Sequence, residues 1–181
     1  MVILPRSLRP GTSALSPVDR EGLKSVCRSA RLMSKVLAAA RSGPDIVVAL
    51  PTHLAVGAGT EWVLTGWDQI ENGTWNADTS TISFHLAATE EGAGARHRYP
   101  MPEAGRFPVV FRDRVNSTIV FQRHLPTPGG RSGLTVSARR DLATGQLDWR
   151  TTLGKGVRMS DPGVRELAEA ALTRFRAEYD I

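Results

Sequence analysis

Short apolar runs dominate the middle of the chain, and they have the spacing of β-strands. The runs "DIVVAL" and "HLAVGAG" are rich in β-branched residues and are separated by Pro51-Thr52, which predicts two adjacent strands. The segments "LTVSARR" and "QLDWRTTL" alternate between apolar and polar residues around "DLATG" and predict a hairpin. Its inward-facing candidates are Leu134, Val136, Leu147 and Trp149.

Three of the chain's four tryptophans lie between Trp62 and Phe84. The alternation around Trp62 and Trp67 is typical of a strand, and Trp75 shares one face with Ile82 and Phe84 across turn residues 76–78. We therefore expect a β-meander, with Trp62, Trp67 and Trp75 on consecutive strands and at least two of them largely buried. Aromatic side chains suit the half-buried surface of a sheet, so this pattern favours a structural role over a binding site.

Two segments have a helical pattern. Asp161 as N-cap and Pro162 as first helical residue predict a C-terminal helix, whose apolar face consists of Val164, Leu167, Ala168, Ala171, Leu172, Phe175 and Tyr179. A weaker pattern begins at residues 16–19. "SKVLAAA" is either the end of that helix or a strand, and residues 107–118 are either helix or strand, whereas "STIVFQRHL" indicates a strand.

These elements predict an α+β protein in which the C-terminal amphipathic helix packs on an antiparallel sheet. The 181 residues, 41% of them hydrophobic, are enough for one domain with a terminal extension. Pro5, Pro10 and Pro17 indicate an irregular leader. We therefore expect a basic N-terminal extension over residues 1–30, irregular with a possible helix, and a single domain over residues 31–181.

Composition indicates a cytoplasmic protein without a membrane span. The single cysteine, Cys27, cannot form an intramolecular disulfide, and the N-terminal apolar run "VIL" is too short for the core of a signal peptide. The chain has no apolar stretch of the roughly 18 residues that a membrane helix requires. We expect no cofactor.

Positive charge is concentrated at the N-terminus. Residues 1–41 contain eight arginines and lysines but only two acids, while the whole chain has a net charge of +5. This basic segment is either a solvated arm or a contact for nucleic acid or another anionic surface. The candidate residues for such a nucleic-acid arm are Arg20, Lys24, Arg28, Arg31 and Lys35.

The sequence offers little evidence of catalysis. His53, His85, His97 and His124 are widely spaced and form no paired metal-ligand motif, so we expect neither a metal site nor catalytic residues. Four groups close in sequence are candidates for anion binding, because arginine forks bind phosphate and carboxylate groups: Arg112, Arg114, Arg123 and His124. Alternatively, acids such as Asp113 and Asp148 neutralise them in ordinary ion pairs.

The order of several segments resembles a family of uncharacterised actinobacterial proteins over about residues 31–180. The resemblance rests on "WVLTGWDQIENGTW", on "RDRVNSTIVFQRHLP" and on the alanine-rich C-terminal segment. The "WDQI" stretch after a strand also looks like pleckstrin-homology-like (PH-like) and GRAM-like domains. These resemblances imply a strongly bent antiparallel sheet capped by a C-terminal helix, and they transfer no activity.

The sequence therefore favours a non-catalytic binding or adaptor protein, with another protein as its partner. One alternative is a nucleic-acid-associated accessory protein that uses the basic N-terminal arm. A second alternative is an enzyme of unknown class.

Overall fold

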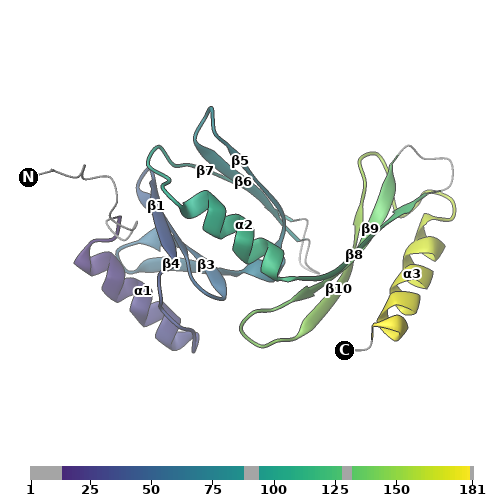
Figure 1. The fold of residues 1–181 in the computed structure, drawn as a ribbon, viewed down its shortest axis with the longest axis horizontal. Helices are drawn as coiled ribbons and strands as arrows, with labels where there is room; N and C mark the ends of the chain where they lie inside the picture. The colour runs from purple at the N-terminus through teal and green to yellow at the C-terminus, as the bar shows by residue number, and fades with distance from the viewer. Residues whose placement is uncertain (1–13, 88–93, 128–131, 180–181) are drawn as a thin grey trace, which may run out of the picture. The chain divides into compact units, whose positions relative to one another are not determined.

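The computed structural model describes residues 14–87, 94–127 and 132–179, which form an α+β fold with three antiparallel sheets (Figure 1). The chain divides into two compact units, Met1–Ser117 and Thr118–Ile181. The sequence analysis instead placed a boundary between residues 30 and 31. Residues 1–13, the first part of the expected leader, lie outside the described residues.

A four-stranded meander forms the first sheet of the first unit. Its strands, in the order in which they pair, are β1 (Ala38–Ser42), β2 (Asp45–Ala49), β3 (His53–Ala58) and β4 (Glu61–Gly66). The predicted neighbours β2 and β3 do pair, with Val48 opposite Ala55. "SKVLAAA" ends in strand β1, which joins β2 through a turn where Gly43 has a φ of 61°, a conformation that favours glycine.

Helix α1 (Pro17–Ser29) covers one face of this sheet (Figure 1). It begins with a capping box in which the Ser16 side chain accepts a hydrogen bond from the backbone of Asp19, while the Asp19 side chain accepts one from the backbone of Ser16. Leu23 and Cys27 are buried against β2 and its neighbours. The helix predicted near residues 16–19 is therefore present and forms part of the core of the first unit.

The predicted meander through the tryptophans is wrong at Trp67. That residue lies in a 3-10 turn, η2 (Trp67–Gln69), after which the chain leaves the first sheet and begins a second one. The second sheet consists of β5 (Ile70–Asn76), β6 (Thr81–Leu86) and β7 (Arg96–Pro100). Trp67 is fully buried, and its Nε1 donates a hydrogen bond to the Leu50 carbonyl at 3.0 Å. The indole is therefore part of the core, while the backbone of Trp67 belongs to a turn and not to a strand.

Helix α2 (Phe107–Ser117) settles the ambiguity over residues 107–118 and lies between the two sheets of the first unit (Figure 1). Phe111 packs edge-on against Trp67, with ring centroids 5.6 Å apart, and also contacts Phe84 of β6. A side chain on Gly73 of β5 would collide with the Phe111 ring. Close packing of α2 therefore joins the second sheet to the core of the first unit.

The second unit is a three-stranded sheet covered on one face by helix α3 (Val164–Glu178), as Figure 1 shows. Its strands pair in the order β10 (Leu147–Leu153), β9 (Gly133–Arg140), β8 (Ile119–Pro126). The predicted β9–β10 hairpin is confirmed, with Ala138 opposite Trp149. Leu134 and Val136 are buried under α3, while Leu147 and Trp149 are half-buried.

The C-terminal helix is confirmed, but its predicted start is wrong. Gly163, with a φ of 75°, occupies the N-cap position, and no side chain caps the helix. Asp161 instead closes the preceding turn, because its Oδ2 accepts a hydrogen bond from the backbone N–H of Arg158 at 2.8 Å. The helix therefore begins two residues later than Pro162.

No helix in the part of the chain that the structure describes is long and apolar enough to cross a membrane.

Candidate functional site

An open cavity of about 670 Å³ lies between the two sheets of the first unit. One wall comes from the first sheet and the other from β6 and β7 of the second sheet. The residues that line it are Asp45, Val56, Gly57, Ala58, Thr60, Glu61, Trp62, Val63, Thr65, Phe84, Leu86, His97 and Tyr99.

The first wall is the face of β2–β4 that lies opposite α1. Val56 pairs with Val63, and Ala58 pairs with Glu61, so their side chains project from this same face. Ile46 is opposite Gly57, which places Asp45 beside Ala58 at the next position of the register. Asp45 and Glu61 thus flank Ala58 in one row across three strands, next to an apolar row.

The second wall is aromatic. The ring centroids of Phe84 and His97 are 5.1 Å apart, and those of Phe84 and Tyr99 are 5.9 Å apart, with the rings of each pair within 30° of parallel. The rings of His97 and Tyr99 are inclined by only 7°, and the Tyr99 hydroxyl lies 3.4 Å from Nδ1 of His97. Strands β6 and β7 hold these rings on one face because Phe84 pairs with His97.

Negative charge acts across the cavity. Burial and then the charge of Asp45 raise the pKa of Tyr99 above its ordinary value of 10.0, so Tyr99 is a neutral phenol at physiological pH. Among the lining residues that the structure describes, Asp45 and Glu61 are acidic and none is a lysine or arginine. The cavity therefore combines an aromatic and apolar lining with two acidic side chains.

The tryptophans contribute little to this site. Trp62 lies at the cavity, but it packs against the core cluster beneath α1, and its Nε1 donates a hydrogen bond to the Gly59 carbonyl at 3.0 Å. Trp67 is fully buried, and Trp75 lies on β5, 36% exposed. The expectation that at least two of the three tryptophans are largely buried is met in full only by Trp67, because Trp62 is half-buried and Trp75 is exposed.

Sequence reasoning missed the residues that form the two walls. The alternation of His97 and Tyr99 with arginines in "RHRYP" is a signal for a strand with one aromatic face. No local pattern connects that strand with Asp45 or Glu61, because they belong to different sheets.

The predicted anion site is divided between the two units. Arg112 and Arg114 lie on α2, two residues apart, and side chains at this spacing do not face each other on a helix. Arg123 and His124 are consecutive on β8, opposite Val136 and Thr135, and consecutive side chains point to opposite faces of a strand. Anion binding by this group stays a prediction.

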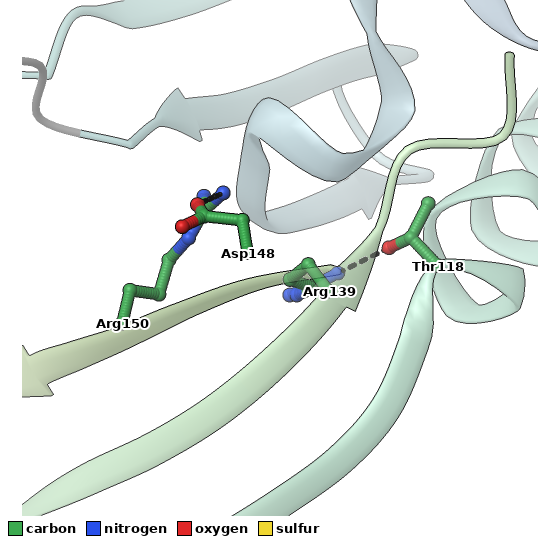
Figure 2. Close-up of polar contacts among 4 residues, drawn as sticks. All are labelled: Thr118, Arg139, Asp148 and Arg150. Atoms are coloured by element: carbon green, nitrogen blue, oxygen red, sulfur yellow. Dashed lines mark hydrogen bonds and ion pairs between the residues drawn. The ribbon is translucent and has the colours of Figure 1, made fainter. Parts of the chain in front are cut away.

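Of the two acids proposed to neutralise the predicted anion site, only Asp113 lies near one of its arginines. The Asp113 carboxylate lies 4.0 Å from Arg112 Nε, and both side chains are exposed. Asp148 instead pairs with Arg150 two residues along β10 (Figure 2). Asp148 also lies opposite Arg139 in the β9–β10 register.

Arg139 is a buried arginine that sequence reasoning did not single out. It is 6% exposed, and its Nη1 donates a hydrogen bond to the hydroxyl oxygen of the fully buried Thr118 at 2.8 Å (Figure 2). A buried guanidinium requires such partners because an unsatisfied charge in the interior is costly. We interpret this contact as part of the core of the second unit.

The candidate residues for a nucleic-acid arm are mostly on a folded helix. Arg20, Lys24 and Arg28 are exposed and four residues apart on α1, so they form one stripe along its surface, hereafter the basic stripe. The Arg20 Nε also donates a hydrogen bond to the Leu15 carbonyl at 3.3 Å. Arg31 and Lys35 are exposed in the segment that follows the helix.

The described residues include no group of three or more His, Cys, Asp or Glu side chains placed to hold a metal ion. The histidines are distributed over β3, β6, β7 and β8. Cys27 is fully buried on the inner face of α1, and this burial raises the pKa of its thiol, which lowers its reactivity.

Comparisons with protein-family models, curated proteins and solved structures find no significant match to this chain. Its candidate function therefore rests on the geometry of its own residues.

Proposed function

We propose that this chain is a non-catalytic binding protein, and that its first unit recognises a protein partner by accepting one of the partner's side chains into the cavity. The observation that supports this proposal most strongly is the combination of an aromatic wall and a carboxylate row around one cavity. A volume of about 670 Å³ falls in the range of small-ligand sites, which have mainly apolar linings and a few polar groups.

The openness of the cavity favours a macromolecular partner over an enclosed small molecule. Val63 lines the cavity and is 68% exposed, although it is a large apolar residue. Exposed apolar surface next to a polar rim is typical of interaction sites, where a partner removes that surface from water. An adaptor of this kind needs no catalytic group.

The PH-like likeness enters this proposal only as an analogy of fold. The feature that supports this analogy is the C-terminal helix α3, which packs on one antiparallel sheet through Ala168, Ala171 and Phe175. A strongly bent sheet of the PH type stays a proposal, and it carries no ligand with it.

Capture of the partner from the native host tests the proposed function. We expect the tagged full-length chain to retain a protein partner after nuclease treatment. Ala58→Phe should abolish that capture, because Ala58 lines the cavity between Asp45 and Glu61 and a phenyl ring there would obstruct the space between these acids. Ala143→Phe, in an exposed turn of the second unit, is the matched control. A partner that Ala58→Phe still captures, or that nuclease releases, would contradict the proposal.

Nucleic-acid binding is the second candidate function, and the basic stripe on α1 is the observation that favours it. Three cations on one helix face can contact successive phosphates, and binding of this type weakens steeply as salt rises because counterions are released. The stripe and the cavity lie on opposite faces of the first sheet, so separate substitutions can test the two functions.

The matching experiment replaces Arg20, Lys24 and Arg28 together with glutamine and titrates an arbitrary duplex and RNA at two salt concentrations. If the stripe binds phosphate groups, the wild type should bind and its affinity should fall steeply with salt, while the variant should lose most of that binding. Equal affinity of the two proteins would exclude the stripe. Arg165→Gln on α3 is an exposed control.

A further inference from the structure

We infer that the cavity of the first unit selects a monovalent organic cation, namely the ammonium of a lysine or the guanidinium of an arginine presented by a partner protein. The inference rests on the proposed function, since it assumes that the cavity holds a partner's side chain. It adds the chemical class of that side chain.

The two carboxylates of the cavity supply the first argument. None of the ion pairs found between described residues includes Asp45 or Glu61. Arg41 pairs with Ile46, on the opposite face from Asp45, and its charge acts on Asp19 in the first turn of α1. A cation that enters the cavity would therefore supply the missing positive charge.

The aromatic wall supplies the second argument. Aromatic rings attract cations through their quadrupole, and cages that combine such rings with acids recognise ammonium groups. Phe84, His97 and Tyr99 are the rings of this wall, and Phe84 and Tyr99 carry no charge at physiological pH. The same carboxylates would repel an anionic ligand.

The apolar rows account for the rest of the side chain. Lysine and arginine carry their charge at the end of an apolar stem, which can lie along apolar surface while the charged group reaches its partners. Val56, Val63 and Leu86 line the cavity beside the acids and the rings. A guanidinium or ammonium group with its stem thus meets each kind of surface that the cavity presents.

The sharpest test compares two peptides that differ only in charge. The probes are acetyl-Gly-Arg-Gly-amide and its citrulline counterpart, in which a neutral urea replaces the guanidinium with nearly the same shape. Each is titrated into the full chain, and binding is followed by backbone amide NMR shifts. We expect the arginine peptide to bind about tenfold more tightly, with shifts at Val63, Leu86 and Tyr99.

Charge-removing variants provide the second readout. Asp45→Asn with Glu61→Gln should weaken the arginine peptide about tenfold and leave the citrulline peptide unchanged, as expected for loss of ionic contacts only. Glu166→Gln, exposed on α3 in the second unit, should change neither affinity. The single variants Asp45→Asn and Glu61→Gln provide the same comparison if the double variant does not fold.

The outcomes separate this inference from the proposed function. Equal binding of both peptides at the cavity, lost in Ala58→Phe, would overturn the choice of a cation and leave a ligand cavity in place. Failure of both peptides to shift the cavity amides, while Ala58→Phe still abolishes partner capture, would likewise overturn the cation inference alone. Capture that survives Ala58→Phe would instead contradict the proposed function.

Discussion

At the scale of single residues, Asp19 joins two parts of the first unit that are distant in sequence. Its Oδ2 accepts a hydrogen bond from the backbone of Ser16 at 2.9 Å, and its Oδ1 accepts one from the backbone of Gly59 at 2.7 Å. The Ser16 side chain, these two N–H groups and the charge of Arg41 lower the pKa of Asp19 below 3.8, although burial opposes them. Ionised Asp19 thus stabilises the fold.

This assignment predicts how the stability of the first unit depends on pH. Because the pKa of Asp19 is lower in the folded state, its contribution is fully present above about pH 4 and disappears as the pH falls through the folded-state pKa. Asp19→Asn should lose about 1–3 kcal/mol of unfolding free energy at pH 7. Urea unfolding followed by tryptophan fluorescence measures this, since Trp62, Trp67 and Trp75 all lie in the first unit.

The control is Asp78→Asn, in the exposed turn between β5 and β6, which should behave as the wild type. The Asp19→Asn curve should also be flatter than that of the wild type between pH 4 and pH 2. An unchanged slope in that range would show that other carboxylates carry the acid sensitivity.

At the scale of elements, close approach of backbones determines how α1 sits on the first sheet. A side chain at Gly22 of α1 would collide with the backbone carbonyl of Gly59, in the turn between β3 and β4. In an isolated helix, alanine is more favourable than glycine by about 1 kcal/mol. Here the packing reverses that preference, because rigid backbone rather than a flexible side chain fills the space.

We therefore expect Gly22→Ala to destabilise the first unit by about 1–3 kcal/mol, the range for overpacking a well-packed site. Ser25→Ala, at an exposed position of the same helix, should be neutral or slightly stabilising. Chemical denaturation of both variants, compared with the wild type, measures the difference. Stabilisation by Gly22→Ala would mean that α1 does not pack this closely.

Helix α3 has the corresponding role in the second unit. The Phe175 ring lies 4.9 Å from that of Phe121 on β8, between centroids, and is 6% exposed. Phe121 also contacts Trp149 and Tyr179, so one aromatic cluster joins the helix to both outer strands of the sheet. Loss of this ring should leave a cavity at the centre of the unit.

Phe175→Ala is expected to cost about 3–5 kcal/mol of unfolding free energy, as large-to-small changes at buried aromatic sites do. Leu172→Ala should cost less, because Leu172 is only half-buried, and Arg176→Ala on the exposed face should change stability little. Thermal unfolding followed by near-ultraviolet circular dichroism measures these changes, and its signal includes that of Trp149 in the second unit. A loss below about 1 kcal/mol for Phe175→Ala would indicate that α3 is detached from the sheet.

At the scale of the whole molecule, the structure changes which experiment can separate the two candidate functions. Truncation of a free basic arm would remove nucleic-acid binding alone. However, Leu15, Leu23 and Cys27 belong to the core cluster of the first unit. Removal of residues 1–30 would therefore expose the apolar face of the sheet that they cover.

We predict that the chain lacking residues 1–30 loses the cooperative unfolding of its first unit and binds a hydrophobic dye. The Arg20, Lys24 and Arg28 glutamine variant should keep the cooperative unfolding of the wild type, because these side chains are exposed. Dye fluorescence and urea titration compare the two proteins. A stable truncated chain that still captures its partner would show that α1 is dispensable for the fold.

The sequence by itself determined the elements whose pattern is local. Strands β2 and β3, the β9–β10 hairpin and the face of α3 around Ala168 and Phe175 follow directly from periods of two and 3.6 residues. These patterns show which residues share a face, and burial of the apolar face stabilises each element in the fold. Among these elements, only the first residue of α3 was misplaced.

Tertiary structure alone decided the state of residues 107–117, the turn at Trp67 and the cavity. The sequence of α2 is compatible with either a helix or a strand. Packing of Phe111 against Trp67 and Phe84 favours the helix. Asp45 and Tyr99 are far apart in sequence and lie in different sheets, so only the packing of those sheets brings their charges into interaction. Periodicity assigns a side chain to a face, but which face lies opposite it depends on long-range contacts.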